Sequence, residues 1–418
     1  MEQATNYARL KMACYTTNAS MSVVASLSPV LFLTFHSLYG ISYSLLGLLV
    51  LINFVTQLTI DLIFSFFSHK FNIPLAVKLT PLLTVVGLFI YAMWPFLMPG
   101  AVYIGLVIGT IIFSCAGGLA EVLISPVIAA IPAKDPDREM SRLHSIYAWG
   151  VVGVILFATL FLQIFGGANW QYLALIFMLI PLTSCILFTT VSVPEMQTQE
   201  KISGVLRFLK NKTLWLCIGA IFFGGATECT MAQWSSGYLE QALGIPKVWG
   251  DIFGTAMFSV MLGLGRTLYA KFGSRIGRIL LLGGIGALIC YLTAALVGIP
   301  VIGLLACAIT GFCVSMLWPG SLIVASDRIP DSGVFIYAMM AAGGDLGASI
   351  GPQLIGLITD ATIASPSLCA FAADLALAPE QLGMKIGMLV GALFPLAAIP
   401  VYFHIYRTEK KKAAAENA

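Results

Sequence analysis

The chain has 418 residues, of which 59% are hydrophobic and only 10% are charged, and its mean hydropathy is +0.94. Because roughly a quarter of the residues in a soluble domain are charged, this composition excludes a water-soluble fold for most of the chain. The formal net charge of +3 is too small to indicate a nucleic-acid partner. The composition therefore predicts an integral membrane protein whose main partner is the lipid bilayer.

Apolar stretches recur along the whole chain and are separated by short polar loops. A helix needs about 20 mainly apolar residues to cross a bilayer, and twelve stretches of this kind can be counted. They begin near Met12, Tyr43, Leu75, Ala101, Ser141, Gln171, Leu214, Val248, Arg278, Val301, Val334 and Gly383. The sequence predicts an all-α membrane protein with twelve transmembrane helices.

Lysine and arginine residues are concentrated in alternate loops. One set of loops and the C-terminal tail contain most of them, whereas connections such as Pro99-Gly100 and Gly298-Ile299-Pro300 contain none. Cytoplasmic loops of membrane proteins are enriched in basic residues. We therefore expect a multi-pass protein of the plasma (inner) membrane with both termini in the cytoplasm.

The longest basic connection divides the chain into two halves of similar size. We expect a six-helix bundle at 1–193, a cytoplasmic linker at 194–212, a second six-helix bundle at 213–406 and a basic cytoplasmic tail at 407–418. A basic-aromatic turn ends the second span at Ser68–Asn72 and recurs at the end of the eighth span, at Tyr269–Gly273. This repetition favours two duplicated halves related by an axis along the membrane normal.

Four acidic residues lie within apolar stretches, at Asp61, Glu121, Glu228 and Asp345. An ionised carboxylate at mid-bilayer costs roughly 2.5 to 3.5 kcal/mol, so each should face a protein interior or an aqueous cavity. Asn53, Gln57 and Asp61 recur every fourth residue and predict one polar stripe on the second span. The functional interpretation is that one or two of these acids carry protons. The alternative is structural, with an acid that pairs with Arg266 or accepts hydrogen bonds.

Two sequence patterns resemble the major facilitator superfamily. Gly265-Arg266 followed by Lys271-Phe272-Gly273-Ser274-Arg275 is similar to its loop signature, and the turn after the second span is a degenerate copy in which His69 replaces the acid. Within this superfamily, three segments resemble the fucose permease-like sugar transporters: Gly118–Pro126, Gly225–Glu228 with Trp234 and Tyr238, and Trp318-Pro319-Gly320. The resemblance implies that Glu121 contacts a proton or sugar, and it suggests gating roles for Lys70, Arg266 and Lys271.

Aromatic and amide side chains in the spans are candidates for binding a polyhydroxylated solute. Aromatic rings can stack on the apolar face of a sugar, and amides can bond to its hydroxyl groups. The candidates are Asn18, Asn53, Gln57, Tyr147, Gln233, Trp234, Tyr238 and Trp318. For each aromatic residue the alternative is ordinary packing between helices.

The residues and the resemblance together favour a secondary active transporter that couples uptake of a sugar-like solute to protons by alternating access, acting as a monomer. The alternative is a proton-coupled exporter of drug-like or organic compounds, because Gly347–Pro352 resembles the drug-antiporter motif, although that motif belongs in span five. We expect no enzyme activity, cofactor or metal, since no cluster of His, Cys and Asp has metal-ligand spacing and no phosphate-binding loop is present.

Overall fold

The computed structural model describes residues 6–41, 43–194, 196, 207–246, 249–273, 275–330, 332 and 334–416. These residues form helices and connecting turns, with no β-strand in the described ranges. The chain divides into two compact units, residues 1–211 with 329–342 and residues 212–328 with 343–418. Most of the predicted linker, residues 195 and 197–206, lies outside the described residues.

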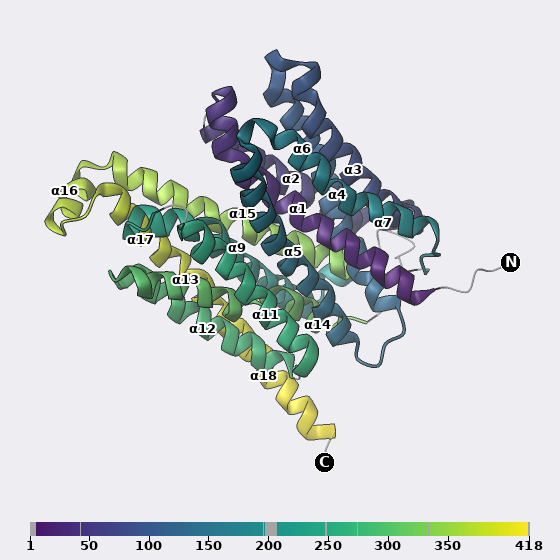
Figure 1. The fold of residues 1–418 in the computed structure, drawn as a ribbon. Helices are drawn as coiled ribbons and strands as arrows, with labels where there is room; N and C mark the ends of the chain where they lie inside the picture. Colours follow the sequence, from purple (N-terminus) through teal and green to yellow (C-terminus); the bar gives the residue numbers. More distant parts are fainter. Residues whose placement is uncertain are drawn as a thin grey trace. The chain divides into compact units, whose positions relative to one another are not determined.

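The first unit is built mainly from the helices α1 to α7, coloured purple to teal in Figure 1. Their bounds are α1 Tyr7–Tyr39, α2 Tyr43–Phe67, η1 Ser68–Lys70, α3 Ile73–Leu97, η2 Pro99–Ala101, α4 Val102–Ala130, α5 Pro136–Phe165, η3 Gly167–Asn169, α6 Trp170–Phe177 and α7 Leu179–Thr189. Local sequence sets several starts, since the side chains of Asn72 and Asp135 accept hydrogen bonds from the first turns of α3 and α5. Both of these helices also begin with a proline in the first turn.

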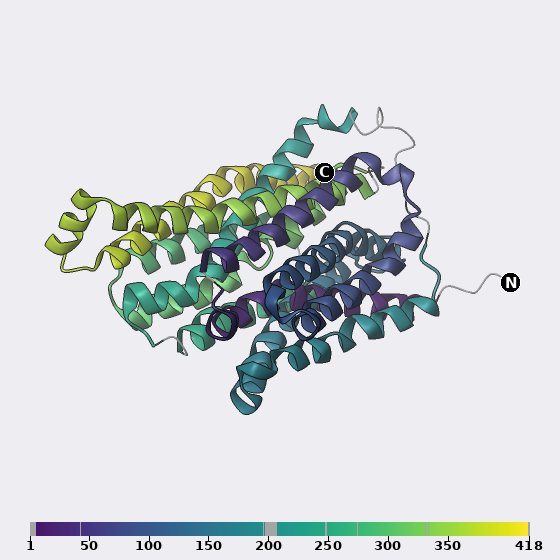
Figure 2. The same ribbon diagram turned by 90° about the horizontal axis from the view of Figure 1, so that it is seen from above.

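The second unit is built from the helices that follow the linker. Their bounds are α9 Lys212–Leu243, the π-helical turn η4 Gly250–Ala256, α11 Met257–Phe272, α12 Ile276–Leu296, α13 Pro300–Val314, α14 Leu317–Arg328, α15 Val334–Ala364, α16 Pro366–Asp374, α17 Pro379–Gly391 and α18 Leu393–Glu416. The beginning of α15, up to Ala342, groups with the first unit. Helix α16 lies at the end of the hairpin formed by α15 and α17 (Figures 1 and 2).

Eleven segments of the described chain are long and apolar enough to cross a membrane. Together with α1, which has 33 residues, they correspond one for one with the twelve predicted spans. The predicted start of the eighth span, Val248, lies outside the described residues. The prediction of an all-α membrane protein with about twelve spans is therefore confirmed.

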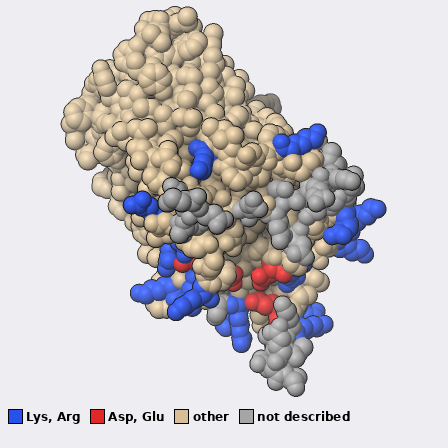
Figure 3. Space-filling model, turned by 90° about the vertical axis from the view of Figure 1, so that its right-hand side faces the viewer, with Lys and Arg blue, Asp and Glu red and all other residues tan. Residues whose placement is uncertain are grey.

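The surface has the character expected of a lipid-facing protein. Leu97, Ile186 and Leu296 are 75%, 61% and 67% exposed, and many other large apolar side chains are exposed along the spans. Most of the face in Figure 3 carries no charge, and the visible Lys, Arg, Asp and Glu gather in one region of it. Because water would disfavour so much exposed apolar surface, a bilayer is the solvent that suits this protein.

Glycines allow close contact between helices within each unit. A Cβ atom added to Gly87 of α3 would lie 2.6 Å from the Phe113 nitrogen of α4, and one added to Gly109 of α4 would lie 2.9 Å from the Gly87 oxygen. In the second unit, Gly347 and Gly351 of α15 press in the same way on the α9 backbone around Ala226. In lipid the hydrophobic effect does not drive helices together. Small residues let the helix backbones approach closely, and the resulting van der Waals contacts stabilise the packing.

Candidate functional site

A row of polar contacts joins α2 to α4 in the first unit. Asn53, Gln57 and Asp61 lie on one face of α2, as their spacing of four residues predicts. The Ser114 hydroxyl of α4 donates a hydrogen bond of 2.6 Å to Asn53 Oδ1. One turn further, Gln57 lies against Gly117, where an added Cβ would be 3.2 Å from the amide oxygen Oε1. The predicted stripe therefore faces α4.

The next pair in this row consists of two carboxyl groups, Asp61 of α2 and Glu121 of α4. One carboxylate oxygen from each lies within 4.8 Å of the other. Asp61 is fully buried, and Gly118 lets the helices approach, since an added Cβ there would lie 3.1 Å from the Gln57 carbonyl oxygen. The structure thus brings together two acids that are 60 positions apart in the sequence.

Two negative charges at this distance repel each other strongly. The repulsion at 4.8 Å is about 3.5 kcal/mol for an effective dielectric constant of about 20. Asp61 is fully buried, whereas Glu121 is half-buried. A shared proton removes this repulsion, as in other close carboxyl pairs. The geometry of Asp61 and Glu121 is therefore suited to holding and releasing a proton.

In the second unit, Glu228 of α9 forms a buried ion pair with Arg266 of α11. Arg266 Nη2 lies 2.9 Å from Glu228 Oε1 and 3.1 Å from Oε2, and the exposed fractions of the two side chains are 2% and 10%. The Arg266 Nε group also donates a 2.9 Å hydrogen bond to the Ser315 carbonyl oxygen. Arg266 therefore connects α9 to the segment between α13 and α14.

The sequence explains why the Ser315 carbonyl accepts this bond. Pro319 has no N–H group, so the carbonyl four residues earlier lacks the donor that a continuous helix would give it. The helix is interrupted there, with α13 ending at Val314 and α14 beginning at Leu317. A carbonyl group without a hydrogen-bond donor is costly in a membrane. The Arg266 guanidinium supplies the missing donor to the Ser315 carbonyl oxygen. Glu228 then serves as the counter-ion, which is the structural alternative for this acid.

The aromatic candidates of the second unit make contacts between helices. Trp234 Nε1 donates a 2.8 Å hydrogen bond to the Pro352 carbonyl oxygen of α15. The hydroxyl of Tyr238, which is fully buried, donates to the Ala294 carbonyl oxygen of α12. The Trp318 ring packs against Gly225 and Gly344. These contacts support the packing interpretation.

The remaining candidates lie in different surroundings. Asn18 of α1 is buried and its Nδ2 donates a 2.6 Å hydrogen bond to the Leu143 carbonyl oxygen of α5, which fixes these two helices together. Tyr147 of α5 is half-buried, whereas Gln233 of α9 is exposed. Asp345 lies in α15 and is 3% exposed.

The lysine of each basic-aromatic turn makes a cation–π contact, but with a phenylalanine at a different position. The Lys70 ammonium lies 5.1 Å from the centroid of the Phe67 ring, and the Lys271 ammonium lies 5.1 Å from the centroid of the Phe272 ring. Both lysines are exposed. Phe272 is the aromatic residue of the predicted repeat, whereas Phe67 precedes the repeat, so the two cation–π contacts at the ends of α2 and α11 are not equivalent.

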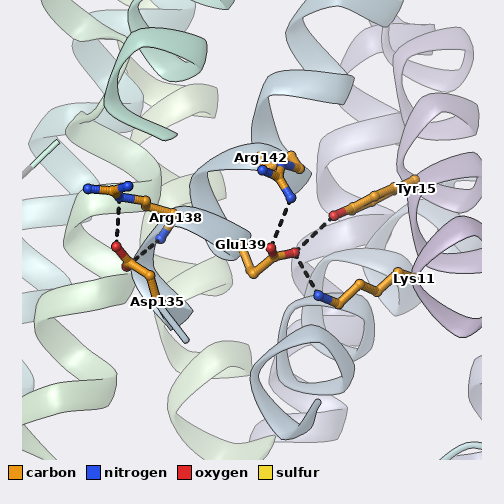
Figure 4. A network of polar contacts seen from close by, with 6 residues as sticks. All are labelled: Lys11, Tyr15, Asp135, Arg138, Glu139 and Arg142. Carbon is orange, nitrogen blue, oxygen red and sulfur yellow. Dashed lines mark hydrogen bonds and ion pairs between the residues drawn. The ribbon is translucent and has the colours of Figure 1, made fainter. Parts of the chain in front are cut away.

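A second polar network joins α1 to α5 and centres on Glu139, which sequence reasoning did not identify (Figure 4). Glu139 Oε2 lies 3.0 Å from Lys11 Nζ and accepts a 3.2 Å hydrogen bond from the Tyr15 hydroxyl, while Oε1 lies 2.9 Å from Arg142 Nη1. The only local signal is the acidic first turn of α5, at Asp137 and Glu139.

We expect Glu139→Gln to lower the stability of the first unit by about 1 kcal/mol, because three partners lose a charged acceptor and the group is only partly exposed. The loss should shrink at high salt. Asp135→Asn is the matched control. The Asp135 and Arg138 side chains form an ion pair in which each is 43% exposed, so its loss should have little effect, and asparagine retains the helix cap. Thermal unfolding of the purified variants at low and high salt measures both effects. An equal loss in the two variants would contradict a special role for Glu139.

Comparison with known proteins agrees with this architecture. The family model described as Major Facilitator Superfamily matches residues 13–352. The structure is similar to that of the E. coli fucose:proton symporter, with a TM-score of 0.68 and 13% identity over 93% of this chain and 98% of that chain. It is also similar to the proton:xylose symporter bound to 6-bromo-6-deoxy-D-glucose, with a TM-score of 0.69 and 15% identity over 94% of this chain and 95% of that chain.

At these identities the structural likeness shows the fold alone. No curated protein matches the chain in sequence. The family model, however, covers well over half of the chain, and its fold is that of the two similar structures. The chain therefore belongs to the major facilitator superfamily.

Proposed function

We propose that the protein is a proton-coupled symporter that takes up a sugar or similar polyhydroxylated solute by alternating access. The observation that carries this proposal is the proximity of the Asp61 and Glu121 carboxyl groups on α2 and α4, whose oxygens lie within 4.8 Å of each other. We further propose that it acts as a monomer in the plasma (inner) membrane. The distribution of Lys and Arg among its loops supports cytoplasmic termini.

The carboxyl pair supplies a reason for protons and solute to move together. In a sealed, apolar site the pair favours a bound proton, because two ionised carboxylates would repel each other. When water or solute hydroxyls reach the site, they solvate the second charge and the proton can leave. A solute that interacts with the pair therefore changes its protonation, which is the requirement for coupled transport.

The neighbouring amides indicate the class of solute. Asn53 and Gln57 precede Asp61 on the same face of α2, so amide donors and acceptors adjoin two carboxyl groups. Such a row can bond to several hydroxyl groups of one solute. The two similar structures are those of a fucose:proton symporter and a proton:xylose symporter, which agrees with this class. Tyr147 and Gln233 remain candidates for binding and Asp345 for proton coupling, whereas the contacts of Trp318 with Gly225 and Gly344 favour a packing role.

Glu228 has a different role in this proposal. Its two oxygens are occupied by the Arg266 guanidinium, which also bonds to the Ser315 carbonyl. We therefore propose that Glu228 and Arg266 hold α9, α11 and the α13–α14 break together, and that Trp234 and Tyr238 act as packing residues. Lys70 and Lys271 remain candidates for gating at the ends of α2 and α11.

The exporter alternative draws on Gly347–Pro352, and this segment has a packing role instead. Added Cβ atoms at Gly347 and Gly351 would collide with the Phe222 carbonyl and the Thr230 hydroxyl of α9. These glycines are needed for close contact between α9 and α15. The likeness to a drug-antiporter motif therefore gives no independent support for export.

Transport into vesicles of known orientation tests the proposal. With the outside more acidic, labelled fucose, xylose or a related sugar is expected to accumulate inside above its external concentration. A protonophore should abolish this accumulation, and a sodium gradient alone should not replace the proton gradient. Acid-driven efflux of organic cations, with no uptake of any sugar in a broad panel, would contradict the proposal and favour the exporter.

A further inference from the structure

Helices α12 and α13 contain three cysteines, Cys290, Cys307 and Cys313, none of which has a part in the proposed transport. A Cβ atom added to Gly286 of α12 would lie 2.7 Å from the Cys313 sulfur of α13, so this sulfur rests on α12. Cys290 follows Gly286 by about one helical turn and shares the same face of α12. The two thiol groups also interact with each other. Cys290 and Cys313 therefore form a close thiol pair within the second unit.

The pair lies beside a surface that faces lipid. Cys290 is 9% exposed and Cys313 is half-buried. Large apolar side chains nearby on both helices are well exposed, with Ile289 at 59% and Phe312 at 44%. A reagent that reaches the thiols must therefore be soluble in hydrocarbon. Both cysteines are free thiols, so both sulfurs can react.

We propose that Cys290 and Cys313 form a binding site for lipid-soluble trivalent arsenicals. An aryl arsenoxide condenses with both thiols: two As–S bonds form, two S–H bonds and the arsenic–oxygen bond break, and the oxygen leaves with both protons as one water molecule. Arsenic stays trivalent throughout, so no oxidant or reductant is needed. The product is neutral and suits an apolar environment.

Other ligands suit this pair less well. A zinc ion requires ionised thiolates and further ligands, and uncompensated charge is costly among apolar side chains. A disulfide requires a narrow range of backbone separations as well as an oxidant. A bridging arsenic atom needs neither thiolate charge in the product nor a direct sulfur–sulfur bond. Two bonds to one protein also favour the bridged adduct over a single-thiol adduct, because the second bond forms intramolecularly.

Phenylarsine oxide binding to the full-length purified protein tests the site. The protein is treated in nanodiscs, washed with excess monothiol and weighed intact by mass spectrometry, and the modified peptides are then mapped. The variants are Cys290→Ser and Cys313→Ser. Cys115→Ser and Cys185→Ser are the matched controls, since both cysteines are also half-buried but lie in the first unit.

The wild-type protein and both controls are expected to retain one phenylarsine group that resists the monothiol and is removed by a dithiol. Each of the variants Cys290→Ser and Cys313→Ser should lose this adduct entirely, and either one suffices if the other does not fold. A charged arsenical that cannot enter the bilayer should leave the pair unmodified. A resistant adduct that persists in a folded Cys290→Ser or Cys313→Ser variant, or its absence from the wild-type protein, would overturn the proposal.

Discussion

Glu121→Gln is expected to abolish accumulation of solute driven by a proton gradient, down to the level of vesicles without a gradient. Glutamine keeps the size and hydrogen-bonding capacity of the side chain but cannot exchange a proton. Exchange of labelled for unlabelled solute across the membrane needs no net proton movement, so it should continue in this variant. Asp61→Asn should give the same result. With only one carboxyl group left, there is no repulsion between two ionised carboxylates to favour a bound proton.

The control for this prediction is Glu139→Gln, an acid on α5 outside the carboxyl pair. It should keep gradient-driven accumulation even if its thermal stability is lower. Loss of accumulation and exchange together in Glu121→Gln would leave that residue with a binding or packing role only. Normal accumulation in both Glu121→Gln and Asp61→Asn would remove the pair from the mechanism.

Arg266→Met is expected to lower the free energy of unfolding by about 3–5 kcal/mol, the usual cost of removing one partner from a buried ion pair. Two groups lose their donor at once, because Arg266 contacts both the Glu228 carboxylate and the Ser315 carbonyl oxygen. The thermal midpoint of the purified variant should fall accordingly, and the loss should be insensitive to salt because the pair is 2% and 10% exposed.

A double-mutant cycle separates the pair from its surroundings. Combining Arg266→Met with Glu228→Leu should recover much of the lost stability, since no unpaired charge remains in the interior. Glu228→Leu alone should be nearly as unstable as Arg266→Met. If the double variant is destabilised by the sum of the two single effects, the residues are not energetically coupled and Glu228 is free to serve in proton transport instead.

Local patterns in the sequence predict the helices and part of the site. Twelve apolar stretches are enough to predict the spans, because each helix must satisfy its own backbone in lipid. The spacing of Asn53, Gln57 and Asp61 also predicts their common face of α2 correctly. Pro319 could have indicated the break before α14, since a proline removes the donor for the carbonyl of Ser315.

Contacts between distant segments could not be predicted in this way. Lys11 and Glu139 are 128 positions apart, and nothing in either local sequence shows that α1 and α5 meet there. The sequence likewise cannot show that the Trp234 indole donates to the Pro352 carbonyl, 118 positions later. An intramembrane tryptophan has the same pattern whether it stacks on a solute or packs against another helix.

Infrared difference spectroscopy of the carboxyl groups tests the central claim most directly. As the pH of the purified protein is lowered, the wild-type spectrum should gain the carbonyl stretch of a protonated carboxylic acid, and the addition of transported solute should alter that band. The band should be absent or shifted in Asp61→Asn and in Glu121→Gln, and unchanged in Glu139→Gln. A spectrum that is the same in all four proteins would contradict the assignment of the transported proton to the α2–α4 carboxyl pair.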